Sequence, residues 1–596
     1  MHRRFKTRFE VQALVLFAAS ASYCVLLADE PNSREREPRF RGPVALVLLD
    51  DGKLLLTANR RSGSISVIDT AAGRVIDEIP VGKKLSDLVA VPGRNLLLAT
   101  DEEAHEVILI ARAGRALTVA GRVPVAAYPV SIAVSPDGTR CFVASLWSRR
   151  LSVIDLVTAL GGRETAGLTI SKIVPMPFAP RKQLVIDKPE ERLIVADAFG
   201  GRLAVIDPAR GEIVQLRELP AHNIRGLAFN ADASRLLVSH QILNSLARTT
   251  RDDVHWGMLM GNIVRSLKLG NVLDTEIDVL RGSVVHPVGE AGNAAGDPAT
   301  IALAAKGQIA VALAGVGEVG LFSEDDSNMR RVAVAGRPAA LVVTPDGSHV
   351  YAADELGDAI SVVSVDKAVK TAEISLGPQP ELSVADRGER LFFDARLSHD
   401  GWMSCHSCHT DGHSNGLLND NLGDGAFGAP KRVLSLLGVG RTGPWAWNGQ
   451  MHDLETQIKK SVETTMRGRS PRGEQVQALA AFLKTLPAAP PIDCAGDVEP
   501  ESVARGKALF EAKRCTQCHA PPEYTSSATY DVGLKDEFDY SKFNPPSLRG
   551  VGQRDALFHD NRANSLADVL TRFKHQLNED LPARELSDLL TFLRSL

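Results

Sequence analysis

Two short motifs place cysteine and histidine at a spacing that suits covalent attachment of a cofactor. The first is Cys405-His406-Ser407-Cys408-His409, and the second is Cys515-Thr516-Gln517-Cys518-His519. Two thiols three positions apart can each form a thioether to a haem vinyl group, and the adjacent histidine can bind the iron. The sequence therefore predicts two covalently bound haem c groups, with His409 and His519 as the proximal iron ligands.

A lone motif of this kind also suits half of a zinc site or a redox dithiol. The sequence has seven cysteines, and neither motif has a second cysteine pair that would complete a zinc site. Outside the motifs, Cys24 falls in the N-terminal apolar segment. Cys141 and Cys494 remain, and they suit either a disulfide in an oxidising compartment or two unrelated buried thiols. Haem attachment is therefore the predicted use of both motifs.

Both motifs lie in a duplicated, helical part of the chain. Arg387-Gly-Glu-Arg-Leu-Phe392 precedes the first motif, and Arg505-Gly-Lys-Ala-Leu-Phe510 precedes the second. A Phe-Leu-x-x-Leu segment closes each copy, and apolar residues recur with helical spacing before it. The pattern predicts two all-α c-type cytochrome lobes, at residues 379–487 and 499–596, joined by a proline-rich linker.

Residues 40–378 repeat one β-strand pattern. Cys141-Phe-Val-Ala-Ser145 is followed by Leu151-Ser-Val-Ile-Asp155, and Val350-Tyr-Ala-Ala-Asp354 is followed by Ile360-Ser-Val-Val-Ser364. Asp-Gly turns precede such pairs, which is typical of tight hairpins. Seven copies with a period of about 40 residues predict an all-β seven-bladed propeller. The repeats resemble the YVTN family of propeller units, which implies a fold but no activity.

One propeller copy is irregular. After Arg225-Gly-Leu-Ala-Phe229 the chain passes through His240, His255 and Trp256 before the pattern returns near Ala299. Such an insertion suits a contact arm over the haem region or part of a substrate pocket. A long decorated loop is the simpler interpretation.

The N-terminus predicts export. Four basic residues between Arg3 and Arg8 precede an apolar run at 11–28, so residues 1–28 are interpreted as a secretory signal peptide. The alternative is an uncleaved anchor helix, and only that alternative would place the chain on a membrane. Either way we expect a periplasmic or otherwise extracytoplasmic protein. A formal net charge of −4 without a basic patch leaves no case for a nucleic-acid partner.

Several short segments of the C-terminal half occur in a recognisable order. They are Leu391-Phe-Phe-Asp-Ala-Arg-Leu-Ser398, Ser404-Cys-His-Ser-Cys-His409, Trp447-Asn-Gly-Gln450, Pro546-Ser-Leu-Arg549 and His559-Asp560. With them, residues 379–596 resemble the bacterial di-haem cytochrome c peroxidase superfamily. The resemblance implies one haem that reacts with peroxide and a second that receives electrons. It also implies that Trp447 assists transfer between the haems and that Glu463 acts as acid and base in O–O cleavage.

The sequence departs from that family at the first haem. The family has a loop histidine that ligates this iron at rest, and the matching residue here is Asp424. The first iron is therefore expected either to be open or to take another sixth ligand. Met466 is the first candidate, ahead of Met451 and His452.

The sequence also departs from the family at the second haem. Phe573 stands where the family has an iron ligand, and phenylalanine cannot coordinate iron. His575, two residues on, is the replacement candidate, and a surface histidine is the alternative interpretation. Arg432 stands at an asparagine of the family's inter-haem calcium site, which makes calcium doubtful. His406 and His413 are interpreted as a filler position and a polar loop position.

Two functions from different classes follow. The first is a peroxidase-like oxidoreductase that reduces hydrogen peroxide or another small oxidant. Its electrons would come from a small redox protein or a quinol-linked donor and pass between the two haems. The second is an electron-transfer cytochrome without peroxidase activity, in which the propeller docks a partner or binds a substrate.

Overall fold

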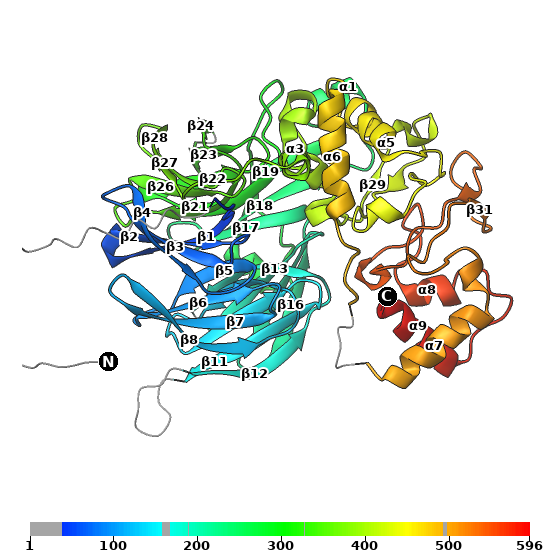
Figure 1. Ribbon diagram of the computed structural model, residues 1–596, viewed down its shortest axis with the longest axis horizontal. Coiled ribbons are helices and arrows are strands. Elements are labelled where there is room, and N and C mark those ends of the chain that lie inside the picture. The colour runs from blue at the N-terminus through cyan, green and yellow to red at the C-terminus, as the bar shows by residue number, and fades with distance from the viewer. Residues whose placement is uncertain (1–37, 158–166, 189, 327, 493–497) are drawn as a thin grey trace, which may run out of the picture.

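The computed structural model describes residues 38–596, except 158–166, 189, 327 and 493–497. The predicted signal peptide and Cys494 lie outside the described residues. A β-propeller occupies one side of the molecule, and a region of helices and loops lies against it (Figure 1). In the described part of the chain, no helix is both long enough and apolar enough to cross a membrane.

The propeller has seven four-stranded antiparallel blades, as predicted. Blades one to four are β1 (Pro43–Leu49), β2 (Leu54–Asn59), β3 (Ser64–Asp69) and β4 (Arg74–Pro80); β5 (Leu85–Ala90), β6 (Leu96–Asp101), β7 (Glu106–Ala113) and β8 (Ala116–Pro124); β9 (Pro129–Val134), β10 (Arg140–Ser145), β11 (Arg150–Val157) and β12 (Gly167–Pro175); β13 (Pro180–Ile186), β14 (Arg192–Asp197), β15 (Arg202–Asp207) and β16 (Glu212–Glu218). Blades five to seven are β17 (His222–Phe229), β18 (Arg235–Leu243), β19 (Met260–Lys268) and β20 (Val284–Pro287); β21 (Pro298–Leu303), β22 (Gln308–Leu313), β23 (Glu318–Ser323) and β24 (Arg330–Ala333); β25 (Pro338–Val343), β26 (His349–Asp354), β27 (Ala359–Ser364) and β28 (Val369–Ser375).

The alternating apolar pattern explains how the blades assemble. The middle strands β2 and β27 are buried along their whole length, whereas the outer strand β28 is mostly exposed. Apolar side chains pack between neighbouring blades and form the core. The first strand of each blade contacts the first strands of its two neighbours, and β1 contacts β25. The ring is closed further by Asp358, whose carboxylate accepts hydrogen bonds from the backbone N–H groups of Arg41 and Gly42 at 2.7 Å.

The irregular fifth blade sends a contact arm to the haem region. The arm lies between β18 and β19 and carries the short helix α1 (Arg251–His255). Trp402 Nε1 donates to the His255 carbonyl at 3.0 Å, and Arg467 donates to the Thr249 carbonyl. The structure therefore favours the contact-arm interpretation over a decorated loop.

The C-terminal region combines short helices with long irregular segments. Its α-helices are α3 (Val384–Phe392), α4 (Cys405–Cys408), α5 (Leu454–Lys460), α6 (Gly473–Thr485), α7 (Pro500–Ala512), α8 (Leu566–Thr571) and α9 (Ala583–Arg594). Its two-stranded sheets are β29 (Leu418–Asn419) with β30 (Lys431–Arg432), and β31 (Tyr530–Asp531) with β32 (Lys542–Phe543). This helix content is lower than the prediction of two all-α lobes requires. Helical periodicity was clear only in the flanking helices, and it did not extend to the loops between them.

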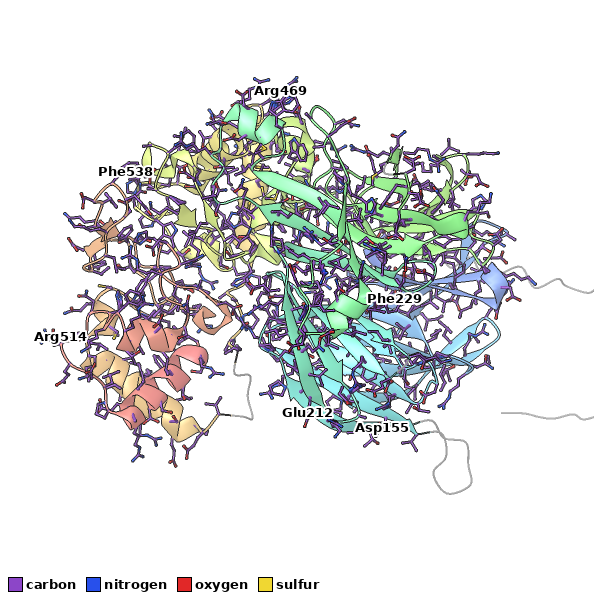
Figure 2. The ribbon with its side chains drawn as sticks, turned by 180° about the vertical axis from the view of Figure 1, so that it is seen from behind. Asp155, Glu212, Phe229, Arg469, Arg514 and Phe538 are labelled. Atoms are coloured by element: carbon purple, nitrogen blue, oxygen red, sulfur yellow. The ribbon has the colours of Figure 1, made fainter. Side chains whose placement is uncertain are left out.

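Figure 2 shows the same arrangement from behind. Asp155, Glu212 and Phe229 lie on the propeller, and Arg514 and Phe538 lie on the C-terminal region. The two parts are also joined through the second motif's half. Arg149 donates to Asp555 at 2.8 Å, and Gln553 Nε2 donates to the Trp147 carbonyl at 2.7 Å. Both halves of the haem region therefore contact the propeller.

The glycine of each duplicated Arg-Gly segment lies where two helices cross closely. Gly388 in α3 faces α6, and Gly506 in α7 faces α9. A Cβ at Gly388 would lie 1.9 Å from the Ala478 carbonyl oxygen, and a Cβ at Gly506 would lie 2.0 Å from the Asp588 carbonyl oxygen. Each glycine therefore permits a close helix crossing that no larger residue can occupy without displacing backbone.

We expect Gly388→Ala and Gly506→Ala each to lower the free energy of unfolding by about 1–3 kcal/mol, because the added methyl group overpacks the crossing. Urea unfolding followed by far-ultraviolet circular dichroism measures the effect. Gly473→Ala is the matched control, since nothing lies within 4 Å of a Cβ at that position in α6. Equal urea midpoints for Gly388→Ala and Gly473→Ala would contradict the crossing argument.

Candidate haem sites

The first motif borders a cavity of about 310 Å³. Its attachment residues Cys405 and Cys408 begin and end helix α4, and His409 follows directly. All three line the cavity, together with apolar residues of the surrounding helices and loops. The lining includes Phe392, Met403, Leu434, Leu436, Val439, Trp445, Leu454, Ile458, Val462, Leu479 and Leu483. An apolar cavity beside two cysteines and a histidine fits a haem group.

The proximal histidines are oriented in the same way in both motifs. His409 Nδ1 lies 2.8 Å from the Leu434 carbonyl oxygen, and His519 Nδ1 lies 3.0 Å from the Tyr524 carbonyl oxygen. A carbonyl acceptor fixes the proton on Nδ1 and leaves the lone pair of Nε2 for a metal. The donor set of each motif therefore suits a haem iron.

Part of the wall of the first cavity is formed by a π-helical turn, η8 (Ser461–Thr465), and Met466. Met466 lines the cavity and is buried. Asp424 also lines it and forms an ion pair with Lys431 at 3.3 Å. By contrast, Met451 and His452 lie outside the lining. Of the three proposed sixth ligands, only Met466 shares a cavity with His409.

Glu463 does not lie where the family resemblance placed it. Its neighbours Val462 and Thr464 line the cavity, but Glu463 does not. Its side chain is one-third exposed, with the carboxylate 4.0 Å from Lys459 Nζ. The structure therefore does not bring this carboxylate into the cavity, and its acid/base role stays a prediction.

Gln457 is a cavity residue that the sequence analysis missed. It lies in α5 and lines the cavity, and its Nε2 donates to Ser461 Oγ at 3.1 Å. Its Oε1 is buried and has no hydrogen-bond partner among the described residues. A buried, unpartnered acceptor is costly in free energy unless a ligand or water supplies a donor. Its helical spacing from Leu454 and Ser461 was the available sequence signal.

Trp447 lies at the junction between the two halves of the haem region. It lines the first cavity, and its Nε1 donates to the Arg432 carbonyl at 2.8 Å. Its carbonyl accepts from the backbone N–H of Asn544, in the second half, at 2.8 Å. Its ring centroid is 6.2 Å from that of His559, which stacks on Phe543 at 4.3 Å. The structure therefore brings Trp447 between the two motif regions.

The second motif is less enclosed. Cys515 begins a short 3-10 turn, η9 (Cys515–Gln517), and His519 follows Cys518. Burial, together with a smaller contribution from the charge of His575, lowers the pKa of His519 to about 4. His575 is therefore near His519, whereas Phe573 packs against Phe558 at 5.3 Å. The structure places His575 close to the second motif, as a sixth ligand of the second haem iron must be.

Two arginines separate the first cavity from a second cavity of about 510 Å³ at the propeller interface. Arg432, which is buried, and Arg554, which is half-buried, line both cavities. Burial lowers the pKa of Arg432 to about 9 and that of Arg554 to about 10. Among the described residues, no carboxylate forms an ion pair with either guanidinium. Two such cations disfavour Ca²⁺ between the motifs but fit the carboxylates of haem propionates.

The propeller holds the first motif through a buried polar network that the sequence analysis did not predict. Asp297, just before β21, accepts hydrogen bonds from the hydroxyls of Ser404 and Ser407. Arg225 of β17 lies with Nη2 2.8 Å from His406 Nε2. His406 is 1% exposed, so its interpretation as a filler position was wrong. No sequence signal links these residues, because they lie more than 100 positions apart.

His413 is likewise buried rather than a polar loop residue. It is 3% exposed, and its ring packs edge-on against Trp147 at 5.5 Å and Phe199 at 4.9 Å. Burial lowers its pKa to about 3. Its location joins the haem region to two propeller blades.

Residues 384–490 match the family model of the di-haem cytochrome c peroxidases. The first half of the C-terminal region is therefore similar to the di-haem cytochrome c peroxidases. The chain is 27% identical to methylamine utilization protein MauG of Methylorubrum extorquens, over 35% of this chain and 76% of that protein. It is 26% identical to cytochrome c551 peroxidase of Nitrosomonas europaea, over 36% of this chain and 79% of that protein. Hydrazine synthase of Kuenenia stuttgartiensis is a structural neighbour with a TM-score of 0.46 and 19% identity, over 55% of this chain and 97% of that chain.

A region that resembles the di-haem peroxidases thus follows a seven-bladed propeller in one chain. The match confirms the predicted resemblance and supports an oxidoreductase with haem groups. The matched residues include the first motif and Met466, while the second motif and part of the cavity lining, such as Phe543 and Arg554, lie beyond them.

Proposed function

We propose that this chain is an extracytoplasmic di-haem oxidoreductase that reduces hydrogen peroxide or a related small oxidant beside His409. One observation carries the proposal. A single cavity begins at the first motif and ends at Trp447 and residues of the second half, such as Phe543 and Arg554. A reaction site and an electron path can therefore share one enclosed, mostly apolar space.

The motif residues and the cavity residues have separate roles in this proposal. When bound, haem supplies the one-electron redox chemistry of its iron at each motif. Cys405 and Cys408 would hold the first group covalently, and the Leu434 carbonyl keeps the proton of His409 on Nδ1. Gln457 Oε1 can accept a hydrogen bond from an oxidant that enters the cavity. The apolar lining excludes bulk water and strengthens that hydrogen bond.

The second motif would receive electrons from a small redox protein or a quinol-linked donor. Cys515, Cys518 and His519 would hold the second haem, with His575 as its candidate sixth ligand. Trp447 would assist transfer to the first haem. The 6.2 Å approach of its ring to that of His559 supports this role, because His559 belongs to the second half.

The proposal predicts that the first iron has an open coordination position and that hydrogen peroxide removes its EPR signal. Low-temperature EPR of the half-reduced protein is expected to show a high-spin ferric signal, and equimolar hydrogen peroxide is expected to remove it. Gln457→Leu keeps the size of the side chain without its carbonyl, so we expect peroxide consumption to slow by about 10²-fold or more. Two low-spin signals that peroxide leaves unchanged in every oxidation state would contradict the proposal.

Electron transfer without peroxidase activity is the second candidate, and one observation favours it. Met466 lies in the same cavity as His409, where a thioether can bind iron as a sixth ligand. Met466→Leu distinguishes the two functions. Under the peroxidase proposal its EPR signals match those of the unmodified protein, whereas under the alternative a new high-spin signal appears.

A further inference from the structure

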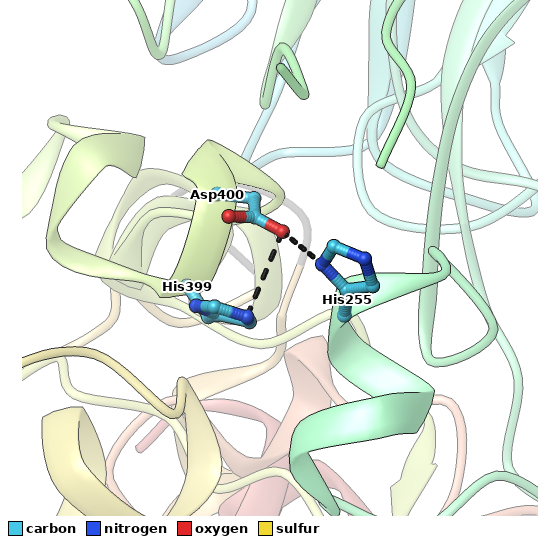
Figure 3. Close-up of side chains that lie close together, drawn as sticks. All are labelled: His255, His399 and Asp400. Atoms are coloured by element: carbon cyan, nitrogen blue, oxygen red, sulfur yellow. Dashed lines mark hydrogen bonds and ion pairs between the residues drawn. The ribbon is translucent and has the colours of Figure 1, made fainter. Parts of the chain in front are cut away.

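Three side chains outside the haem cavity converge on one point (Figure 3). His255 ends helix α1 of the propeller's contact arm, and His399 and Asp400 form the turn η4 (His399–Gly401) shortly before the first motif. His255 Nδ1 lies 2.6 Å from Asp400 Oδ2, and His399 Nε2 lies 3.6 Å from the same oxygen. Their ligand atoms all lie within 4.8 Å of one another.

This spacing is that of a metal-binding set. Zinc bonds to nitrogen and oxygen of about 2.0–2.2 Å place neighbouring tetrahedral ligands about 3.3 Å apart. The two distances to Asp400 Oδ2 bracket that value, so small side-chain shifts suffice. Two imidazoles and one carboxylate also match the ligand types that divalent transition ions prefer.

The surroundings hold the three side chains but leave them accessible. The side chains of His255, His399 and Asp400 are 35%, 18% and 16% exposed, so an ion and its water can enter. Asp400 has a left-handed backbone with φ of 61°, and its carbonyl accepts from the Ala294 N–H at 3.1 Å. Its Oδ2 also accepts from the Gly292 N–H at 3.2 Å. Such outer contacts orient a metal-binding carboxylate.

We propose that His255, His399 and Asp400 bind one divalent transition-metal ion such as Zn²⁺, with water completing its coordination. The ion links the propeller to the haem region, because His255 and Asp400 lie 145 positions apart in the chain. It also stabilises the wall of the first haem cavity, since the His399 N–H donates to the carbonyl of Met466, a lining residue, at 2.9 Å. The site does not depend on the chemistry at either haem.

The experiment uses the full-length di-haem protein after dialysis against a chelator, which leaves covalently attached haem in place. Titration with Zn²⁺ alone, by calorimetry and elemental analysis, is expected to give one zinc per two haem irons. Zinc-edge X-ray absorption is expected to show two imidazole nitrogens and additional oxygen ligands at about 2.0–2.2 Å.

Three variants test the ligands individually. His255→Ala and His399→Ala are each expected to weaken zinc binding at least 100-fold, since even outer-shell changes cost 10–100-fold. Asp400→Asn should weaken it as well while preserving the left-handed backbone, which asparagine tolerates. His349→Ala is the matched control. Among the described residues, the side chain of this half-buried propeller histidine hydrogen-bonds only Ser348 Oγ, at 2.8 Å.

Two results would overturn the proposal. One is a wild-type protein that retains no zinc after titration. The other is a His255→Ala/His399→Ala double variant that binds zinc with unchanged affinity and an unchanged absorption spectrum. Haem content and the Soret band of each variant confirm that it is folded, so a loss of zinc binding is not mistaken for unfolding.

Discussion

Replacement of Trp447 by leucine is expected to slow electron transfer between the two haems at least tenfold, or about 1.4 kcal/mol in activation free energy. The indole borders the first cavity and faces the His559 ring of the second half, and the Trp447 backbone carbonyl accepts from the Asn544 N–H. Leucine removes the aromatic ring from this junction but still fills much of its space. The variant therefore tests the path between the haems rather than the integrity of the fold.

Flash reduction of the second haem, followed optically at both Soret bands, measures this rate directly. Trp445→Phe is the matched control. Trp445 also lines the cavity and donates its Nε1–H to a carbonyl, that of Val439 at 3.1 Å, but it packs within the first half. We expect the control to keep the wild-type inter-haem rate within about twofold. If both variants transfer electrons at the wild-type rate, Trp447 is not part of the path.

Asp297→Ala is expected to destabilise the first haem region by about 2–5 kcal/mol. The substitution leaves the buried hydroxyls of Ser404 and Ser407 without their acceptor, and each such loss costs about 1–3 kcal/mol. Both serines flank attachment cysteines, so loosening them also loosens the cofactor. Urea unfolding monitored at the Soret band reports on this region. Asp232→Ala, at an exposed propeller turn, is the control and should shift the midpoint little.

The Asp297 carboxylate also leads us to expect a loss of folding stability at acid pH. Burial alone raises the pKa of Asp297, but the neighbouring His406 imidazole and the hydrogen bonds from Ser404 and Ser407 outweigh burial and lower it to about 2. A depressed folded-state pKa stabilises the protein above the unfolded value of about 3.9, and that contribution is lost as the pH falls toward 2. Asp297→Asn should therefore show a weaker loss of stability between pH 4 and pH 2 than the unmodified protein. Identical acid profiles for the two proteins would contradict this account.

Local features of this chain were predictable from the sequence. Propeller strands such as β10 (Arg140–Ser145) depend on short, buried, mostly apolar runs and tight turns, which are properties of a few adjacent residues. The haem motifs were equally local, because thioether and iron bonds require cysteines and a histidine within five positions. The paired helices at Gly388 and Gly506 could be anticipated from the repeated Arg-Gly segment, although their close contacts could not.

Side-chain direction was the first property that only the folded chain decided. Glu463 and Gln457 lie in adjacent helical segments, yet the glutamine lines the cavity and the glutamate does not. Glu463 was assigned from the resemblance, because the family has a carboxylate nearby. A one-residue change of helical register suffices to change which side chain faces a cavity.

By itself, then, the sequence determined the propeller, the two haem attachment motifs and the resemblance of the C-terminal region to the di-haem cytochrome c peroxidases, since each depends on short-range patterns. Tertiary structure alone decided that Asp297 and Arg225 of the propeller hold the first motif. It also decided that the contact arm brings His255 to Asp400. These contacts join segments more than 100 positions apart, and their geometry arises only when the blades close and the haem region packs against them.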